Sequence, residues 1–328
     1  MIAPLERLAH NPLLRPSQVV FAAATGVFNP AAVVDHRSGR VAILFRVFDG
    51  KTRHSCLGMA LSTDGVNIDE IWDRPALAPA APYEDWGIED ARVTYLAEEQ
   101  RYAVTYTGYS SAGPRVCLIT TDDILDPRRY RRHGPRICAD DKNTVVFPEK
   151  IGGRYAILHR PMPRIVLCGA ASLEEEWPAE GIALVGPRPG TWRSSRVGAG
   201  APPLRTPLGW LFPFHGATGI EEGNVYSMGW CLLDLADPSR VLYVSDSPAL
   251  APAAPYEVQR EAVPQVDMAN FRDGIRVVFP EGMVERGGEL IVYYGAADVN
   301  VGAARIDKAE LLASLKAAMA RGEGAVPL

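Results

Sequence analysis

The amino-acid sequence predicts an all-β fold, a five-bladed β-propeller with a short C-terminal helix, and three internal repeats predict it. An eight-residue pattern occurs five times, in which a turn residue and a polar or mixed position precede alternating aromatic and aliphatic residues. The segment Pro75–Glu84 returns letter for letter as Pro248–Glu257. A shorter segment, Val145–Glu149, returns as Val277–Glu281. Self-similarity at intervals of several tens of residues is typical of arrays of supersecondary units.

Each copy of the eight-residue pattern has the alternation of a β-strand. The copies start at residues 39, 100, 153, 208 and 288, and such intervals leave room for about four short strands each. Five units of this size favour a propeller, and a pair of β-sandwich domains is the alternative. Further strand-like runs follow the copies, at Cys56–Ser62, Arg115–Thr121, Ile165–Ala170, Val225–Leu233 and Val301–Ile306.

One helix is expected, at Lys308–Ala320, with Asp307 as a suitable N-cap. The apolar residues at helical spacing are Leu311, Leu312, Leu315 and Met319. We expect this helix to lie on the outside of the propeller. No linker or change of composition divides the chain, so a single catalytic domain is predicted for residues 1–328. The two Ala/Pro-rich copies would then connect neighbouring blades.

Composition and charge argue against several classes of protein. Apolar residues make up 47% and charged residues 22% of the chain, which suits a folded core and not a disordered chain. The net charge is −5 and no long run of Lys or Arg occurs, so neither nucleic acid nor an anionic membrane is an expected partner. No stretch has the features of a signal peptide or a membrane span, and the five cysteines lack metal-site spacing. We therefore expect a cytoplasmic protein with reduced thiols and no bound metal.

The acid-rich segment Tyr83–Arg92 is the candidate for catalysis. Its four acids are Glu84, Asp85, Glu89 and Asp90. Trp86 and Ile88 lie between them, and because buried ionised carboxylates are costly unless paired, this mixture indicates a loop folded over something polar. Arg92 lies two residues after Asp90, on the same side of an extended segment, where it could orient that carboxylate. The alternative is an exposed acidic turn.

The last position of the eight-residue pattern carries a positive or potentially positive group in three copies. The five residues at this position are Arg46, Thr107, Arg160, His215 and Gly295. The innermost strands of a propeller line its axial channel, so equivalent strand ends converge there. We expect the two arginines and the histidine to meet at one site, although each arginine could instead extend to solvent. Lys142 and Arg196 add positive charge, and such a cluster suits a phosphate held by side chains.

Six short motifs occur in order along the chain: Gly87–Arg92, Phe147–Lys150, His159–Arg160, Arg196–Pro203, Phe214–Gly216 and Tyr293–Asp298. Together they resemble glycoside hydrolase family 130, whose members are mainly β-mannoside phosphorylases. The resemblance extends from about Asn29 to Arg305 and keeps the family's order of motifs. It implies a five-bladed propeller, which agrees with the number of repeats.

The resemblance also implies a role for each matching residue. Asp90 matches the catalytic acid. The contacts to the mannosyl unit that is cleaved match Asn29, Arg46 and Asp298. The phosphate-binding set matches Lys142, Arg160, Arg196, His215 and Tyr226. The family often has Arg at Lys142 and Lys at Arg196, and these departures exchange a planar fork for a point charge, which affects how a phosphate is held.

This set of residues suits phosphorolysis. An inverting glycosidase needs an acid and also a base that activates water, whereas phosphate arrives as an anion and needs only positioning and charge neutralisation. The resemblance thus implies an inverting phosphorylase that cleaves a β-mannoside or mannooligosaccharide with inorganic phosphate, without another cofactor, to give α-mannose 1-phosphate and a shortened acceptor. The alternatives are a β-mannosidase of the same family and a non-catalytic sugar-binding propeller. The acceptor sugar, the linkage and any homo-oligomer stay open.

Overall fold

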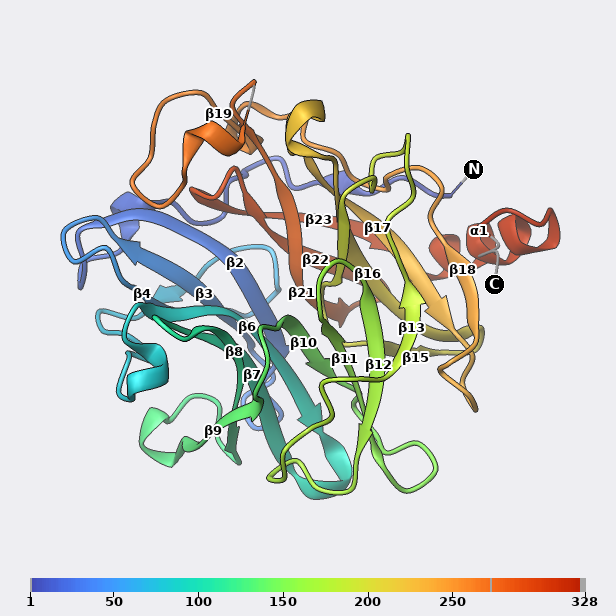
Figure 1. Ribbon diagram of the computed structural model, residues 1–328, viewed down its shortest axis with the longest axis horizontal. Coiled ribbons are helices and arrows are strands. Elements are labelled where there is room, and N and C mark those ends of the chain that lie inside the picture. The colour runs from blue at the N-terminus through green and yellow to red at the C-terminus, as the bar shows by residue number, and fades with distance from the viewer. Residues whose placement is uncertain (1, 272, 325–328) are drawn as a thin grey trace.

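The computed structural model describes residues 2–271 and 273–324, and its strands form five antiparallel blades around a common centre (Figure 1). Blade 1 contains β2 (Ala24–Val34), β3 (Val41–Asp49), β4 (Ser55–Ser62) and β5 (Glu70–Ile71). Blade 2 contains β6 (Gly87–Leu96), β7 (Arg101–Ser110), β8 (Gly113–Thr121) and β9 (Arg131–Ile137). A single parallel pair, Ser55 with Gly87, joins these two blades.

Blade 3 contains β10 (Lys142–Val146), β11 (Tyr155–Arg160), β12 (Ile165–Ala170) and β13 (Ile182–Val185). Blade 4 contains β14 (Arg196–Ala199), β16 (Gly209–Ala217), β17 (Tyr226–Leu233) and β18 (Val241–Val244), with β15 (Leu204–Thr206) also paired to β16. Blade 5 contains β21 (Val278–Arg286), β22 (Glu289–Ala296), β23 (Asn300–Asp307) and β1 (Glu6–Arg7). The predicted five-bladed propeller is thus confirmed.

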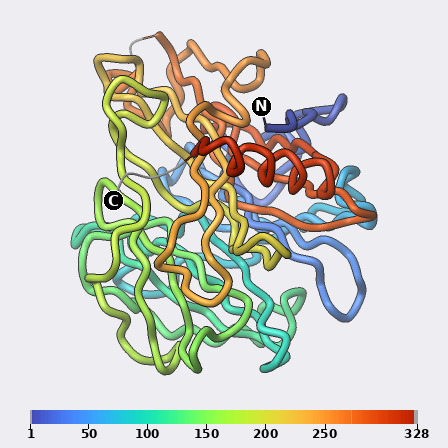
Figure 2. Tube along the Cα trace, turned by 90° about the vertical axis from the view of Figure 1, so that its right-hand side faces the viewer, coloured from blue at the N-terminus to red at the C-terminus, as the bar shows by residue number. Residues whose placement is uncertain are grey.

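The N-terminal strand closes the ring. β1 pairs antiparallel with β23, with Glu6 opposite Arg305 and Arg7 opposite Ala304. Figure 2 shows the blue N-terminal segment beside the red C-terminal part of the chain. The first and last strands therefore share one blade, and β23 is not left as an open sheet edge.

Five hydrophobic clusters lie between neighbouring blades and fix their order around the ring, because each cluster combines residues from two successive blades. The alternation of side chains along a strand explains how one blade takes part in two clusters. In β3, Ala42 and Leu44 pack toward blade 2, whereas Ile43 and Phe45 pack toward blade 5. Both faces of the long strands are therefore buried, which accounts for their nearly continuous apolar sequence.

The five copies of the eight-residue pattern form the second strand of each blade. These strands are β3, β7, β11, β16 and β22. The expectation that the copies are the innermost strands is therefore wrong, since β2, β6, β10, β14 and β21 precede them and pack against one another at the centre. The copies are alike because they all lie between two flanking strands, whereas the first strands carry irregularities that serve the site.

The repeated ten-residue segments connect blades, as expected. Each ends in a short 3₁₀ turn, Pro82–Glu84 or Pro255–Glu257, and the closing glutamate is fully buried in both. The Glu84 carboxylate accepts a hydrogen bond from Ala80 N at 2.8 Å, and Glu257 accepts one from Ala253 N at 2.8 Å. The buried carboxylate therefore folds each connection back on itself.

The two glutamates also bind equivalent partners in the following blade. Tyr106 on β7 donates to Glu84 at 2.6 Å, and Tyr294 on β22 donates to Glu257 at 2.8 Å. An arginine from the outermost strand completes each set: Arg132 on β9 for Glu84, and Arg7 on β1 for Glu257. β1 thus takes the place in blade 5 that β9 has in blade 2.

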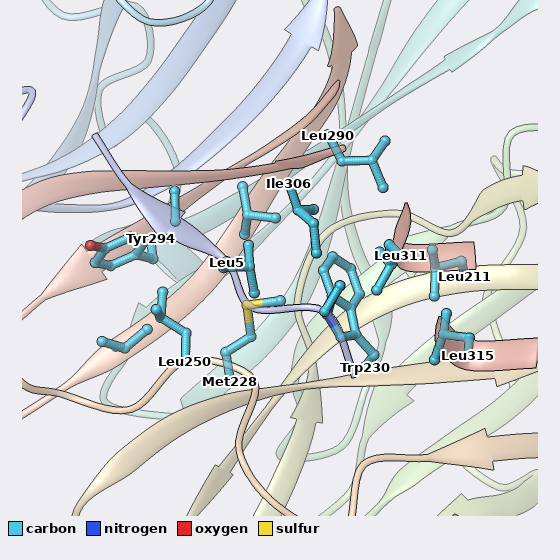
Figure 3. Close-up of a cluster of buried hydrophobic side chains, with 14 of the residues drawn as sticks. Leu5, Leu211, Met228, Trp230, Leu250, Leu290, Tyr294, Ile306, Leu311 and Leu315 are labelled. Carbon is cyan, nitrogen blue, oxygen red and sulfur yellow. The ribbon is translucent and has the colours of Figure 1, made fainter. Parts of the chain in front are cut away.

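The helix α1 (Lys308–Ala320) has the predicted bounds, and the Asp307 carboxylate accepts a hydrogen bond from Glu310 N at its N-terminus. It lies at the outside of the ring, as expected (Figure 1). One face is nevertheless buried, and Figure 3 shows Leu311 and Leu315 beside Leu211 and Trp230 in the cluster between blades 4 and 5. No helix among residues 2–271 and 273–324 is both long and apolar enough to span a bilayer.

The longest connection runs from blade 4 to blade 5. It contains a small two-stranded sheet, β19 (Val258–Gln259) and β20 (Ile275–Arg276), and the 3₁₀ turn Met268–Asn270. This segment extends the interval between the fourth and fifth copies of the pattern, and part of it covers the site described next. The remaining 3₁₀ turns are Pro16–Gln18, Ala97–Glu99, Pro127–Arg129 and Ile220–Glu222.

Candidate active site

Breaks in strand register turn polar side chains toward the centre on four of the five first strands. In β2, β6 and β10 the break contains Asn29, Asp90 and Asn143, with φ angles of +50°, +56° and +56°. Asn and Asp accept this left-handed conformation more readily than most residues. The fourth break, in β21, contains Glu281. Since a bulge re-aims the side chain that it carries, these residues leave the regular alternation and face the axis.

A cavity of about 230 Å³ lies at this level. Seven of the nine residues expected from the sequence line it, and they come from all five blades: Asn29, Arg46, Asp90, Lys142, Arg160, Tyr226 and Asp298. The structure therefore brings together groups that are far apart in the sequence, and both Arg46 and Arg160 face the cavity rather than open solvent. The lining also includes Phe28, Asn143, Gln265 and Phe279, which the sequence had not indicated as site residues.

The other two expected residues, His215 and Arg196, lie behind or beside this lining. His215 is fully buried, with Nε2 3.4 Å from Arg160 Nη1 and its ring stacked on Phe279 at 4.2 Å. Arg196 donates from Nε to the Tyr226 hydroxyl at 2.9 Å, and its guanidinium lies 5.0 Å from the centre of the Tyr226 ring. Both residues therefore act on the cavity through the neighbour that they contact.

The charge of His215 differs from the sequence interpretation. Burial lowers the pKa of His215 well below its ordinary value, and the nearby positive charges of Arg160, Arg92 and Arg196 lower it further. The imidazole is therefore neutral near pH 7, and Nε2 accepts a hydrogen bond from Arg160. His215 orients a cation and is not itself the third cation.

Asp90 is held by groups that favour its ionised form. Its Oδ1 accepts a hydrogen bond from Asn29 Nδ2 at 2.9 Å and lies 3.4 Å from Arg46 Nη1. Burial alone would raise the pKa of Asp90, but the charges of Arg46, Lys142 and Arg92, together with the hydrogen bond from Asn29, hold the pKa below its ordinary value. The unliganded site thus keeps this carboxyl ionised.

Glu89, the residue before Asp90, binds two of the cations in the cavity. Arg46 Nη2 lies 2.7 Å from Glu89 Oε1, and Lys142 Nζ lies 2.9 Å from Oε2. Arg46 also donates from Nε to Ser55 Oγ at 2.9 Å. Lys142 is therefore bound to the acid-rich segment of blade 2.

Asp298 is a second carboxyl group in the cavity, with the opposite tendency. It lies in the turn between β22 and β23 at φ +55°. Burial raises the pKa of Asp298 to about 6. The positive charge of Arg46 opposes this effect, and the negative charges of Asp90 and Glu89 add to it. Gln265 donates to the Asp298 carbonyl at 2.8 Å and so fixes the covering segment from the blade 4–5 connection at this edge. One cavity thus contains two carboxyl groups whose pKa values are pushed apart, as in many acid–base sites.

Comparison with known proteins identifies the family. The model of glycoside hydrolase family 130, described as β-1,4-mannooligosaccharide phosphorylase, matches residues 10–317. The chain belongs to this family. A β-1,2-mannobiose phosphorylase of Thermoanaerobacter sp. (strain X514) is 31% identical over 93% of this chain and 97% of its own length. A 1,2-β-oligomannan phosphorylase of the same organism is 32% identical over 94% of this chain and 98% of its own length.

A solved structure of similar shape is the β-1,2-mannobiose phosphorylase from Listeria innocua in complex with β-1,2-mannobiose. It has a TM-score of 0.81 and 29% sequence identity, and the match covers 95% of this chain and 99% of that chain. The similarity therefore extends over the whole ring of blades of this family 130 protein and is not confined to one motif.

In this family 130 protein, the contacts of Arg92 differ most from what the sequence predicted. It was expected to face the Asp90 carboxylate, but Nη1 instead donates to the Asp90 carbonyl at 2.7 Å. Its Nε donates to the Gly200 carbonyl at 3.3 Å, and Nη2 donates to Asn143 Oδ1 at 3.3 Å and lies 2.7 Å from Glu281 Oε1. A single buried guanidinium therefore connects four blades and fixes the peptide of Asp90.

Glu281 and Asp141 were not predicted as parts of the site, and His159 was noted only in the motif His159–Arg160. Burial raises the pKa of Glu281 well above its ordinary value; Arg92 opposes this effect and Asp90 adds to it. His159 Nδ1 lies 2.6 Å from Asp141 Oδ2, and Asp141 Oδ1 accepts a hydrogen bond from Arg160 N at 2.9 Å. This buried pair supports the backbone that carries Arg160. In the part of the chain that the structure describes, no group of three or more His, Cys, Asp or Glu residues is placed to hold a metal ion.

Proposed function

We propose that this protein is an inverting phosphorylase, which cleaves a β-mannosidic bond with inorganic phosphate and releases α-mannose 1-phosphate. The observation that carries this proposal is the state of Arg160. Its guanidinium lines the cavity, its Nε has no hydrogen-bond partner, and no described carboxylate lies within ion-pair distance of it. Arg160 is only partly exposed, and a cation shielded from water without an anionic partner is costly, so an anion such as phosphate suits this position.

In the proposed complex the phosphate lies against blades 3 and 4. Arg160 donates to it directly, and the Tyr226 hydroxyl, which already binds Arg196, donates from the side. His215 keeps Arg160 directed into the cavity through Nε2. The phosphate is anionic before it reacts, so no base has to activate it.

Asp90 is the proposed general acid for the departing oxygen, directly or through a sugar hydroxyl. The free site keeps Asp90 ionised, and its protonation therefore has to accompany substrate binding. A phosphate dianion in the same cavity adds negative charge near Asp90 and raises its pKa. The mannoside displaces water, which has the same effect. The acid is thus formed in the complex that uses it.

The mannosyl unit is proposed to contact Asn29, Arg46 and Asp298. These residues come from blades 1 and 5 and line the same cavity as Arg160 and Tyr226. Lys142 is also assigned to the phosphate, although its Nζ binds Glu89 in this structure. No cofactor besides phosphate is part of the proposal, and the single catalytic domain and the cytoplasmic location stay predictions.

For the linkage we propose β-1,2. The two Thermoanaerobacter relatives and the Listeria structure carry β-1,2 names, whereas the family description names β-1,4. The test incubates the enzyme with β-1,2- or β-1,4-mannobiose, with and without phosphate, and measures α-mannose 1-phosphate and free mannose separately. Formation of α-mannose 1-phosphate from the β-1,2 disaccharide alone supports both parts of the proposal. Release of free mannose at equal rates with and without phosphate contradicts the phosphorylase and indicates the β-mannosidase.

A further inference from the structure

Large apolar side chains are exposed in connections on one face of the ring. First strands begin and second strands end on this face of the ring, and four exposed apolar residues lie in its connections: Val20, Trp86, Met162 and Ile220. Trp86 is the aromatic member and is 49% exposed. Tryptophan is highly buried on average, and it is enriched at binding surfaces.

Contacts of the backbone and of the ring fix the position of Trp86. The buried Glu84 carboxylate anchors the turn just before it. Trp86 N donates to the Tyr109 carbonyl at 2.8 Å, and the two rings meet edge to face at 5.3 Å and 78°. Lys142, which lines the cavity, lies with Nζ 5.1 Å from the centre of the Tyr109 ring. Trp86 is therefore held in place, with Tyr109 between it and the cavity wall.

Trp86 lies across the ring from the proposed phosphate position. Gly87 pairs with Ser55 of blade 1, so Trp86 stands at the junction of blades 1 and 2. Arg160 and Tyr226 belong to blades 3 and 4. In a ring of five blades the junction of blades 1 and 2 lies opposite blade 4, so Trp86 and Tyr226 are on opposite sides of the axis. An inverting displacement sends the leaving group away from the face that the nucleophile attacks, so the acceptor sugar departs toward Trp86.

The duplicated segment shows that the aromatic residue is not required by the connection itself. After Glu84 the chain continues with Asp85 and Trp86, whereas after the equivalent Glu257 it continues with Val258 and Gln259. The two anchored turns are otherwise alike in their buried contacts. The fold of the connection therefore does not require a tryptophan on the blade 2 side, and we look to a bound ligand to explain Trp86.

We propose that Trp86, supported by Tyr109, stacks against the second sugar unit on the acceptor side of a β-mannan oligosaccharide. Trp86 is not part of the cavity wall, and the cavity is small for a ligand pocket. The sugar next to the cleaved bond therefore occupies the mouth, and only the next unit reaches the indole. This inference rests on the proposed function and adds a chain-length preference to it.

The test compares di- and trisaccharides of the linkage that the wild type cleaves. Trp86→Ala is expected to raise the Michaelis constant for mannotriose about 3- to 10-fold, the size of one aromatic stacking contact, and to leave that for mannobiose unchanged. Trp86→Phe should restore most of the effect, because it keeps a ring. Ile182→Ala is the matched control, since Ile182 is similarly exposed but lies at the start of β13, away from the mouth.

An equal change for both substrates, or none for either, would overturn the inference. A wild type that forms no α-mannose 1-phosphate from any mannoside would instead overturn the proposed function. In that case calorimetric titration of mannotriose into wild type and Trp86→Ala still tests the stacking surface. Weaker binding by the variant supports the surface, and equal binding contradicts it.

Discussion

At the scale of single residues, the site depends on two carboxyl groups with opposite proton affinity. Asp90 has a lowered pKa because cations surround it, whereas burial and two neighbouring acids raise the pKa of Asp298 to about 6. The difference arises from position relative to Arg46, Arg92 and Lys142. It could not have been predicted from residue types, because both residues are aspartates at φ near +55°.

Asp298→Asn is expected to make the protein more stable at pH 8 than the wild type. A carboxyl whose folded pKa is raised binds its proton more tightly in the folded state, so its contribution to stability is lost as pH rises from about 4 through about 6. The gain of the variant should be about 1–3 kcal/mol at pH 8 and vanish near pH 4. Urea unfolding at both pH values measures it. A gain that does not change with pH would contradict the raised pKa.

Asp90→Asn should lower the turnover number about 10²- to 10⁴-fold, the usual effect of losing general acid catalysis. The variant should still fold, because the amide oxygen can accept the hydrogen bond from Asn29, but it loses the stabilising interaction of the Asp90 charge with Arg46 and Lys142. Asp85→Asn is the control, since Asp85 is an exposed acid of the same segment. Near-normal turnover by Asp90→Asn would remove this residue from the acid role.

Arg160→Ala should raise the Michaelis constant for phosphate about 10- to 150-fold, as expected for one lost charge-assisted contact. The constant for the mannoside should change little, because that substrate is assigned to the opposite side of the cavity. Steady-state kinetics that vary each substrate separately decide this. Arg154→Ala, an exposed arginine of the same hairpin, serves as the control. Equal effects on both constants would mean that the whole site has been disturbed.

At the scale of elements, the turn before each second strand shows how the repeats constrain the backbone. Gly39, Gly153 and Gly288 open three copies of the pattern with φ of +70°, +78° and +88°. The second copy has Gln100 at the same place, with φ +51°. A side chain in this left-handed region is strained, and glycine is not.

Gln100→Gly is therefore expected to stabilise the protein by about 0.5–1 kcal/mol. Gln100 is exposed, so little packing is lost. The reciprocal change, Gly39→Gln, should destabilise by a similar amount. Thermal or urea unfolding of both variants measures the difference. A loss of stability in Gln100→Gly would show that the side chain makes contacts that outweigh the strain.

The sequence was sufficient to predict the strands that repeat, but it was insufficient to predict the strands that do not. Second strands were recognised because a strand buried on both faces keeps a long apolar alternation. The first strands were not recognised as innermost, because β10 and β14 are short and a bulge interrupts β10. Asn143 was missed for the same reason, since nothing local marks a bulge. Phe279 and Glu281 could have been found, because they lie in the repeated segment Val277–Glu281.

At the scale of the whole molecule, the ring is held by contacts that bridge blades. Arg92 joins four blades at the axis, and Arg7 ties the N-terminal strand to Glu257 at the rim. The last positions of the repeated pattern predicted that distant residues meet at the centre, but they did not show which charged side chains pair with each other. The neutral state of His215 and the pairing of Lys142 with Glu89 arise only from this assembly.

Arg7→Ala and Arg132→Ala form a matched pair that tests ring closure. Each removes an arginine from an equivalent buried glutamate and should cost about 1.5–3 kcal/mol for the lost charged hydrogen bonds. Arg7→Ala should cost more, because Arg7 binds Glu257 through both Nε and Nη2, whereas Arg132 binds Glu84 through Nη1 alone. Urea unfolding of both variants compares them. A smaller cost for Arg7 would mean that β1 contributes little to closure.

The pairing of β1 with β23 also sets an order of events during synthesis. The partner of the first strand is translated near the end of the chain, so the N-terminal segment has to wait while blades 1 to 4 leave the ribosome. Contacts of such long sequence separation form slowly. The cavity proposed as the active site is lined by residues of every blade, and no nascent fragment can possess it. Turnover by this enzyme would consequently report that the final blade has been completed and sealed.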